Sequence, residues 1–566
     1  MRTKEYKVDF CVVGGGLAGL CAAIAAARHG IRTLLMQDRP VLGGNASEEI
    51  RMWVCGAHGR DNREGGLLEE LELDNYYYNP GLKYPLWDGV LYQKAMAETN
   101  LTLLLNTSCL QAETDGARIC SVTGWQSNAE TWHRVEAAFF ADCSGDSILA
   151  PLTGAHFRYG RESRAEFGET IPPEQADRKT MGMSCLFQIR QTDSPKPFIP
   201  PPSANVYPTD ADLPFKDHTL DNNFWWIELG GEDDCIHDTD KCREELLKIV
   251  YGVWDHMKNR GDHGAQNWEL EWVGFLPGKR ESRRYVGDVT VTQTDVEAGG
   301  PFPDAVAYAG WSMDDHFPQG FRYNKGHPTI YHPAPSPWCI PFRALYSVNI
   351  ENLLFAGRNI SVTHAALSSC RVMGTCALLG QAVGCAAAQM VQTGTTPRTL
   401  DIPALQRTLA LEDCGIPGRA REPGRAAMAA RMSHPVLRDG FERGEEHLFI
   451  GPEGSRVGCT FAAPVPIAGV RLVFDSDFNR GYHNMPCRYL LHETGYRLPD
   501  TLVREFDLTY VFADGTEQTV TYENHLRLRM LPAPEKAGEG VRAVWATLRG
   551  ARCGEARLFA FEVLDA

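Results

Sequence analysis

Apolar runs separated by glycine-rich turns define the first forty residues. Residues 7–13 (KVDFCVV) form an apolar run typical of a buried parallel strand, and the small residues that follow the glycines predict a helix ending at Gly30. Residues 31–38 (IRTLLMQD) predict a second strand. A strand, a helix and a strand in this order indicate a βαβ unit and an α/β fold.

The turn between the first strand and the helix carries three glycines in a G-x-G-x-x-G frame. Gly14, Gly16 and Gly19 suit a tight turn, a close backbone approach to a pyrophosphate and close helix–strand packing. The helix start at Leu17 and Ala18 presents N–H groups and a positive dipole end to the phosphates. The motif predicts a Rossmann-like dinucleotide site, and a glycine-rich turn without a ligand is the alternative.

The end of the second strand departs from the usual pattern. Gln37 stands where a ribose-binding acid is usual, and Asp38 and Arg39 follow it. An amide can also hydrogen-bond a hydroxyl group, so the sequence leaves open whether Gln37 or Asp38 holds the ribose.

The clean alternation of strands and helices ends in the middle of the chain. Residues 155–345 hold Pro/Gly-rich loops, aromatic clusters and short strand-like runs such as FWWIELGG and DVTVTQTDV, with an amphipathic helix predicted over 242–261. Residues 401–440 are typical of helical turns and a linker. From about residue 441, apolar and polar residues alternate between turn signals, which predicts an all-β sandwich.

Composition and charge exclude several classes of partner. Lys+Arg total 56 and Asp+Glu total 72, a net charge of −16 that disfavours nucleic acid and anionic membranes. No apolar run reaches the roughly 18 residues of a membrane span, and the N-terminus lacks the pattern of a signal peptide. The 17 cysteines are scattered without a CxxC, as expected in a reducing compartment. We therefore expect a cytoplasmic protein.

Four segments that follow the βαβ unit carry a family resemblance. VLGGNASEEIR, FFADCSGDSILAPLTGA, NLLFAGRNIS and CRVMGTCALLGQAVG occur in the order of the FAD domain of glutathione-reductase-type flavoproteins. Together with WDGVLYQKAMAETNLTLLLNTS and VGFLPGKRESRRYVGD, they resemble the bacterial FAD-dependent oxidoreductase family over about residues 6–400. Some members of that family carry a xanthan-lyase label. The resemblance implies FAD binding and redox chemistry.

The resemblance also implies how the cofactor is held. The second glycine pair would run along the pyrophosphate, and the last small-residue helix would point its N-terminus at the flavin pyrimidine. The predicted FAD-binding residues are Gly14, Gly16, Leu17, Ala18, Gly19, Gln37, Asp38, Arg39, Gly43, Gly44, Asn45, Ser47, Cys109, Ser144, Gly145, Asp146, Gly357, Arg358, Arg371, Met373, Gly374 and Thr375.

These observations divide the chain into five parts. The Rossmann-like FAD-binding domain takes residues 1–154 and 346–400, and an interleaved antiparallel β substrate domain takes 155–345. A helical linker over 401–440 leads to a C-terminal jelly-roll sandwich over 441–566. The last part resembles galactose-binding-like modules, which hold sugars or only pack against a catalytic domain.

His364 is the first catalytic candidate, because SVTHAALSSCR lies between two segments that the resemblance places at the flavin. A neutral imidazole there would take a hydroxyl proton while hydride goes to flavin N5. A structural histidine that is hydrogen-bonded within its loop is the alternative.

His316 and Arg280 are the other catalytic candidates. His316 follows Asp314 and Asp315, but this cluster lacks further ligands at metal-binding spacing, so we predict no metal and keep His316 as a substrate contact. Arg280 lies in the charge run 279–284, from which Arg280 or Arg283 would approach substrate or flavin carbonyls, although most such runs are solvated or ion-paired.

Three functions stay open at this point. The first is oxidation of a hydroxyl-bearing carbon of a carbohydrate or glycoside, suggested by the aromatic residues of the substrate domain and the C-terminal module; core packing explains those aromatics equally well. The second is flavin-dependent reduction of an activated C=C bond, with Arg280 or Arg283 as acid or clamp. The third is a non-catalytic carbohydrate-binding flavoprotein. A second G-x-G-x-x-G is absent, so the electron acceptor is unidentified, and the oligomeric state stays open.

Overall fold

The structure is a computed structural model that describes residues 1–486 and 497–566. The chain forms two compact units: unit 1 comprises Met1–His58, Leu82–Leu405 and His483–Tyr496, and unit 2 comprises Gly59–Gly81, Gln406–Tyr482 and Arg497–Ala566. This division differs from the sequence-based boundaries, which left residues 59–81 within the FAD-binding domain. The cause is α2 (Gly66–Tyr78), whose carboxylates pair with an arginine of unit 2 that stands more than 400 residues later.

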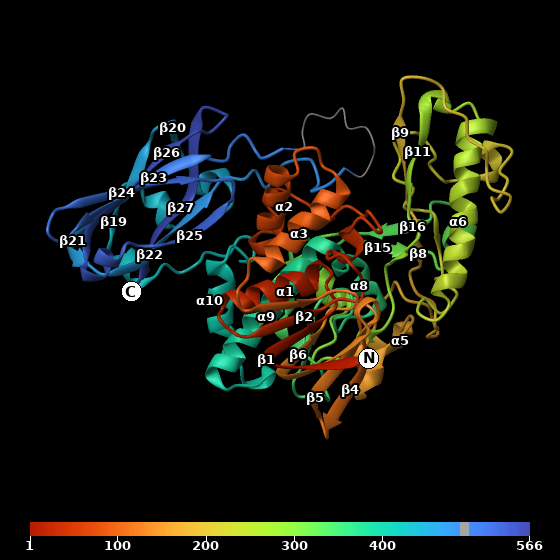
Figure 1. The fold of residues 1–566 in the computed structure, drawn as a ribbon, viewed down its shortest axis with the longest axis horizontal. Helices are drawn as coiled ribbons and strands as arrows, with labels where there is room; N and C mark the ends of the chain where they lie inside the picture. The colour runs from red at the N-terminus through yellow and green to blue at the C-terminus, as the bar shows by residue number, and fades with distance from the viewer. Residues whose placement is uncertain (487–496) are drawn as a thin grey trace. The chain divides into compact units, whose positions relative to one another are not determined.

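A seven-stranded sheet forms the centre of unit 1 (Figure 1). Its strands are β1 (Arg2–Val13), β2 (Thr33–Met36), β3 (Leu101–Leu104), β4 (Thr107–Asp115), β5 (Arg118–Gln126), β6 (Thr131–Asp142) and β18 (Leu353–Phe355). The order is β3-β2-β1-β6-β5-β4, with β18 beside β6. Strands β1, β2, β3, β6 and β18 are parallel to one another, whereas β5 pairs antiparallel with both β6 and β4. The predicted first βαβ unit is confirmed, because α1 (Leu17–Arg28) joins β1 to β2.

Helix α9 (Met373–Thr393) packs against α1 through small residues. A Cβ atom added to Gly380 would lie 2.0 Å from the carbonyl oxygen of Ala18, and one added to Gly384 would lie 2.2 Å from that of Ala22. The predicted small-residue helix is therefore confirmed, and its glycines allow a close backbone approach. Within the described part of the chain, α9 is also the one helix apolar and long enough to cross a membrane, but 89% of its apolar window is buried.

Residues 183–279 form short strands and one long helix. They are β8 (Met183–Ser184), β9 (Phe187–Gln191), β10 (Glu228–Leu229), β11 (Trp268–Val273), β12 (Gly278–Lys279) and α6 (Thr239–Asp255). The amphipathic helix predicted over 242–261 is confirmed by α6 and the π-helical turn His256–Arg260 that continues it. Figure 1 shows α6 beside β9 and β11, and all three contribute to one apolar core.

Two strand expectations for this domain were wrong or too long. FWWIELGG contains only the two-residue strand β10. DVTVTQTDV forms no strand; it leads into the short helix α7 (Gln293–Glu297). The reason is a capping box, in which the Thr292 side chain accepts from the Asp295 backbone and Asp295 reciprocates. Local capping outweighs the β-branched run.

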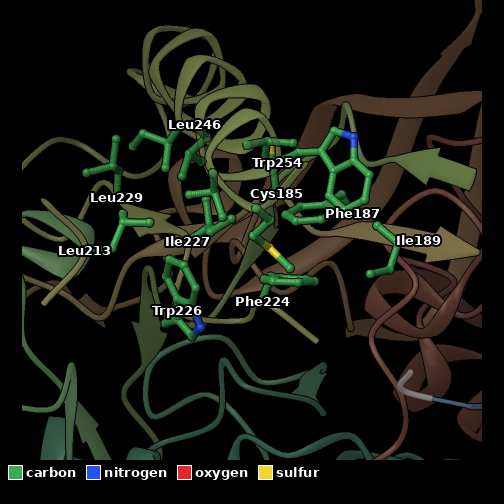
Figure 2. Packing of buried hydrophobic residues seen from close by; sticks show 14 of the residues in the cluster. Cys185, Phe187, Ile189, Leu213, Phe224, Trp226, Ile227, Leu229, Leu246 and Trp254 are labelled. Carbon is green, nitrogen blue, oxygen red and sulfur yellow. The ribbon is translucent and has the colours of Figure 1, made fainter. Parts of the chain in front are cut away.

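Several aromatic residues between 155 and 345 belong to the core, while Trp225, Trp311, Phe317 and Tyr331 stay partly or largely exposed. Phe224 stacks on Phe187 with ring centroids 4.0 Å apart, and Trp254 from α6 completes this packing (Figure 2). Trp226 and Trp338 are also buried. Core packing therefore accounts for these side chains, and the candidates for ligand contact are those that remain partly exposed.

Unit 2 contains two antiparallel sheets. Their strands are β19 (Arg431–Met432), β20 (Phe449–Pro452), β21 (Arg456–Val465), β22 (Ile467–Phe474), β23 (Glu505–Phe512), β24 (Glu517–Glu523), β25 (Leu528–Pro532), β26 (Val541–Arg549) and β27 (Glu555–Asp565). The sheet orders are β19-β21-β26-β23-β24 and β20-β27-β22-β25. Burial alternates residue by residue along β23, as the sequence pattern predicts. The jelly-roll and galactose-binding likenesses stay predictions.

Candidate active site

The turn between β1 and α1 has a backbone that only glycine fits. Gly14 has φ +102°, and an added Cβ would lie 2.5 Å from the backbone of Cys143. A Cβ at Gly19 would lie 1.8 Å from the carbonyl oxygen of Gly14. Helix α1, which starts at Leu17, has no side-chain cap and no acidic residue in its first turn. Its first N–H groups can therefore receive a phosphate.

The two residues considered for the ribose have different environments. Gln37 is buried, and its Oε1 accepts from the Gly15 backbone N–H at 2.7 Å while its Nε2 donates to the Val41 carbonyl at 3.2 Å. The Asp38 side chain is 63% exposed and lies 3.9 Å from Arg39. Gln37 uses its amide to hold the glycine turn in place. Asp38 is therefore the exposed side chain that can accept a hydrogen bond from a ribose hydroxyl.

The second glycine pair lies directly against the first turn. Gly43 forms a parallel bridge with Gly16, and a Cβ at Gly44 would lie 3.1 Å from the Gly16 Cα atom. Ser47 donates to the Gly44 carbonyl at 2.7 Å, and Arg39 Nη2 lies 3.8 Å from that same Cβ position. The two loops thus form one surface with bare backbone on both sides, as a pyrophosphate requires.

Asp146 is the centre of a charged cluster after β6. Its carboxylate accepts from Lys279 Nζ at 2.7 Å, Arg358 Nη2 at 2.6 Å and the Ser282 hydroxyl at 2.8 Å. Burial opposes ionisation, but the charges of Arg358 and Lys279 hold the pKa of Asp146 below its ordinary range. The cluster brings three predicted residues together, because Gly145 faces the Arg358 guanidinium.

Asp142, at the end of β6, is a residue that the sequence reasoning missed. Its buried carboxylate accepts from the Ser144 backbone N–H at 2.9 Å, the Leu149 N–H at 2.8 Å and the Tyr285 hydroxyl at 2.6 Å. Burial raises the pKa of Asp142. An acid at the end of the strand in FFADCSGD was the available signal. Asp142 shapes the turn that presents Gly145 and Asp146.

Two buried polar atoms near these turns have no hydrogen-bond partner among the described residues. They are Asn359 Oδ1 and, in the first turn of α9, Thr375 Oγ1. A Cβ at Gly357 would lie 3.5 Å from Asn359 Oδ1 and 3.6 Å from the Ala18 Cβ atom, which places Asn359 by the start of α1. Buried polar groups without partners are rare, so these atoms fit a polar ligand. Asn359 was also missed by the sequence reasoning.

The other predicted cofactor residues make internal contacts. Asn45 Nδ2 donates to the Lys279 carbonyl at 3.2 Å, and the Gly374 backbone N–H donates to the Cys55 carbonyl at 2.8 Å. Met373 is the first residue of α9. Burial raises the pKa of Cys109 to about 12, so its thiol is neutral.

His364 lies between two carboxylates at the N-terminus of α8 (His364–Cys370). Its Nδ1 is 2.9 Å from Glu281 Oε2, and its Nε2 is 3.0 Å from Asp315 Oδ1. Burial lowers the pKa of His364, but the two carboxylates outweigh burial and raise it to about 10. The imidazole is therefore charged at neutral pH, which corrects the neutral base predicted from the sequence. Neither ring nitrogen is available to take a proton.

His316, on β15 (Met313–His316), has the same arrangement. Its Nδ1 is 2.6 Å from Glu228 Oε2, and its Nε2 is 3.2 Å from Asp314 Oδ2. Burial opposes the charge, but the two carboxylates raise the pKa of His316. Asp314 also accepts from Arg371 Nη2 at 3.1 Å and from the Thr329 hydroxyl at 2.5 Å. The adjacent residues Asp314 and Asp315 therefore join two carboxylate–histidine–carboxylate groups.

Arg280 belongs to the His316 group rather than to that of His364. Its Nη1 donates to the Ser184 hydroxyl at 2.9 Å, its Nη2 donates to the Trp225 carbonyl at 3.0 Å, and it lies 3.5 Å from Glu228. The Trp225 ring lies 5.3 Å from that of His316, and Tyr331 is exposed nearby on β16 (Thr329–His332). This side of the site therefore contains the ion pairs of Glu228 with Arg280 and His316, and the rings of Trp225 and Tyr331 lie beside them.

Comparison with known proteins agrees with a dinucleotide-binding redox fold. The family model described as FAD dependent oxidoreductase matches residues 9–409. No curated protein matches. Solved structures that match include a geranylgeranyl bacteriochlorophyll reductase-like protein from Thermoplasma acidophilum, at 11% identity over 72% of this chain and 84% of that one, with a TM-score of 0.33.

Two further solved structures show the range of these likenesses. A p-nitrophenol 4-monooxygenase from Pseudomonas putida is 10% identical over 72% of this chain and 86% of that one, with a TM-score of 0.32. A glycerol-3-phosphate dehydrogenase from Bacillus halodurans, complexed with FAD, is 14% identical over 33% of this chain and 40% of that one, with a TM-score of 0.21. Similarity this low does not assign an activity.

The glycine turns and the βαβ unit define a dinucleotide-binding protein of the flavoprotein class. Because the family model covers most of the chain, the chain belongs to the FAD-dependent oxidoreductase family. Its cofactor is FAD, and the family membership makes it an enzyme.

Proposed function

We propose that this enzyme oxidises a hydroxyl group of a neutral, polyhydroxylated compound, a carbohydrate or glycoside. Bound FAD supplies the acceptor for the hydride that leaves the carbon. The observation that supports the proposal is the group formed by Glu281, His364 and Asp315, in which a charged imidazole holds a partly exposed carboxylate.

Asp315 is the group to which the hydroxyl proton goes. Its side chain is 19% exposed, more than that of Glu281, Glu228 or Asp314. Burial opposes ionisation, but the hydrogen bond and charge of His364 lower the pKa of Asp315. A hydroxyl becomes strongly acidic as hydride leaves its carbon, so a carboxylate of lowered pKa can accept the proton. In this role His364 positions Asp315 and is not the base itself.

The balance of charge supports a neutral substrate. Arg280 faces Glu228, and Arg371 faces Asp314. Both imidazolium groups are likewise paired with carboxylates. No excess charge of one sign remains in this set to bind an ionic substrate, whereas hydroxyl groups can donate and accept. The exposed ring of Tyr331 offers an apolar face of the kind on which a sugar ring packs.

Reduction of an activated C=C bond is the second candidate. The observation in its favour is that burial lowers the pKa of Arg280, which makes this guanidinium a better proton donor. Its two terminal nitrogens already donate to Ser184 and Trp225, which is the reason for ranking this reaction second.

Anaerobic flavin reduction tests the proposal. The FAD-loaded enzyme is mixed with neutral sugars and glycosides, and the loss of oxidised-flavin absorbance is followed. We expect reduction by a neutral hydroxyl compound, and a rate about 10²–10⁴-fold lower in Asp315→Asn with FAD retained. Asp233→Asn, which alters an exposed pair with Lys241, is the matched control and should react at the parent rate. Reoxidation of reduced enzyme by an alkene, with no reduction by any hydroxyl compound, would overturn the assignment.

A further inference from the structure

Four residues of the substrate domain converge on one point that the proposed reaction does not use. They are Asp210, His218, His256 and His263. Asp210 begins a short 3-10 turn, His256 follows the last residue of α6, and His263 comes just after the π-helical turn. Their ligand atoms all lie within 4.8 Å of one another. Loops and a helix end that are distant in sequence thus bring four potential metal ligands together.

The tautomers of two of these histidines follow from their backbone contacts. His256 Nδ1 lies 2.8 Å from the Tyr207 carbonyl, and His218 Nδ1 lies 2.6 Å from the Lys216 carbonyl. A carbonyl oxygen only accepts, so each Nδ1 carries the proton and each Nε2 of a neutral ring carries a lone pair. Metal-binding histidines have this same arrangement, in which an outer carbonyl orients the ring.

The lone pairs face one another across short distances. His256 Nε2 lies 3.1 Å from His263 Nε2 and 3.0 Å from Asp210 Oδ1. The His256 Nε2 lone pair and the Asp210 carboxylate oxygen both accept, so they repel at this distance unless a cation or an added proton lies between them. The three imidazole rings meet at 62° to 72° with centroids 4.8 to 5.1 Å apart, so they radiate from a point and do not stack.

The spacing suits a tetrahedral ion. Zinc–ligand bonds of about 2.0–2.1 Å place tetrahedral ligand atoms about 3.3 Å apart. Asp210 Oδ1 lies 3.0 Å from His256 Nε2, 3.4 Å from His263 Nε2 and 3.6 Å from His218 Nε2. Three imidazoles with one carboxylate are ligands that zinc accepts and that Mg²⁺ and Ca²⁺ do not favour.

We propose that Asp210, His218, His256 and His263 form a zinc site in the substrate domain. Four protein ligands fill the tetrahedron, so the site is structural and leaves no position for a reacting water. The ion ties the loop that carries Asp210 and His218 to the end of α6. Its entry path is the Asp210 side, since that side chain is 73% exposed whereas the His256 side chain is fully buried. The sequence pattern predicted no metal, because these four residues have no recognisable ligand spacing.

Gly261 offers a way to block the site without removing a ligand. A Cβ there would lie 2.2 Å from His263 Nε2, 2.4 Å from His263 Cδ2 and 3.3 Å from His256 Nε2, so the His263 ring would have to move. The backbone at Gly261 has φ −92°, which alanine adopts without strain. Gly261→Ala therefore displaces the His263 ring from its position in the cluster, while all four ligand residues remain in the sequence.

The test uses the FAD-loaded full chain from zinc-supplemented cultures. Elemental analysis should find one zinc per chain, and zinc X-ray absorption should show a first shell of light atoms at about 2.0 Å with imidazole scattering. His256→Ala, His263→Ala and Gly261→Ala should each weaken zinc binding by more than about 100-fold and keep the parent's FAD content. Asp262→Asn and His237→Ala, at exposed residues outside the cluster, should bind zinc as the parent does.

The melting temperature provides a second readout. Chelation should lower the melting temperature of the parent and leave that of His256→Ala unchanged, because a bound ion stabilises only the folded form. If another divalent first-row ion is bound by the same ligands, the site is supported and the identity of its metal is corrected. The proposal is overturned if the parent and His256→Ala bind zinc equally. It is also overturned if the zinc-treated parent contains far less than one metal ion per chain.

Discussion

The two histidine clusters of unit 1 contain the same side chain in opposite electrostatic settings. In the candidate active site, His364 and His316 each lie between two carboxylates. In the proposed zinc site, three imidazoles share the single carboxylate of Asp210. The pKa of His364 is raised to about 10, while burial and the neighbouring histidines lower that of His263. The ratio of carboxylates to imidazoles decides whether histidine becomes a fixed cation or a neutral ligand.

This difference also separates what the two regions can do. A histidine paired on both ring nitrogens cannot exchange a proton, so in the active site the reactive role passes to Asp315. A histidine whose Nδ1 is held by a carbonyl keeps an Nε2 lone pair for an ion, as His256 and His218 do. The local partners, and not the residue type, determine the chemistry.

The largest expected effect comes from removing one carboxylate of the charged group. Glu281 is fully buried, lies 2.9 Å from His364 and 3.5 Å from Arg284, and accepts from the Met181 N–H. Glu281→Gln leaves these cations without full compensation, and we expect a loss of about 3–5 kcal/mol in unfolding free energy. Denaturant unfolding followed by circular dichroism measures it.

The matched control for this change is Glu269→Gln. Glu269 pairs with Arg190 at a partly exposed position, where an ion pair contributes about 0–1 kcal/mol. Equal losses in the two variants would mean that the His364 group carries no buried charge, and the contrast between the clusters would fail.

The sequence predicted those parts of the site that depend on local pattern. The glycine frame between β1 and α1 needs only neighbouring residues, and it was placed correctly. His364 was singled out, but its charge depends on Glu281 and Asp315, which are 83 and 49 residues away. No alternation of apolar and polar residues reports such pairing.

The proposed zinc ligands could not be predicted from the sequence for a related reason. The four residues come from two loops and a helix end, and no cysteine pair or short repeat marks them. The grouping of residues 59–81 with unit 2 was missed too, because it depends on the pairing of Glu69 and Glu72 with Arg480. Contacts between distant charged residues are the part of this protein that its sequence patterns do not reveal.

The pH dependence of stability should have opposite signs in the two clusters. The folded pKa of His364 is about 10 and its unfolded pKa is about 6.5. Its contribution is therefore complete below about pH 6.5 and is lost as the pH rises towards 10. The stability advantage of the parent over His364→Gln should shrink across that interval, as measured by denaturant unfolding at a series of pH values.

His263 provides the opposing slope in chelated protein. Because its folded pKa is lowered, its contribution is present above the unfolded value of about 6.5 and is lost as the pH falls. The advantage of the parent over His263→Gln should shrink on acidification. Slopes of the same sign in both comparisons would contradict the assigned charge states.

The smallest expected effect concerns a hydroxyl that supports the His316 group. Thr329 is buried and donates to Asp314 Oδ1 at 2.5 Å. Thr329→Val removes one hydrogen bond to a charged acceptor and keeps the shape of the side chain, so we expect a loss of about 1.5–3 kcal/mol in unfolding free energy, measured by denaturant unfolding.

The control is Thr519→Val, at an exposed pair of threonine hydroxyls, which should lower the unfolding free energy by less than about 0.5 kcal/mol. Asp314 keeps its contacts with His316 and Arg371 in the variant, so its effect should stay below that of Glu281→Gln. If Thr329→Val costs as much as Glu281→Gln, the hydrogen bonds and not the balance of charge hold these groups together.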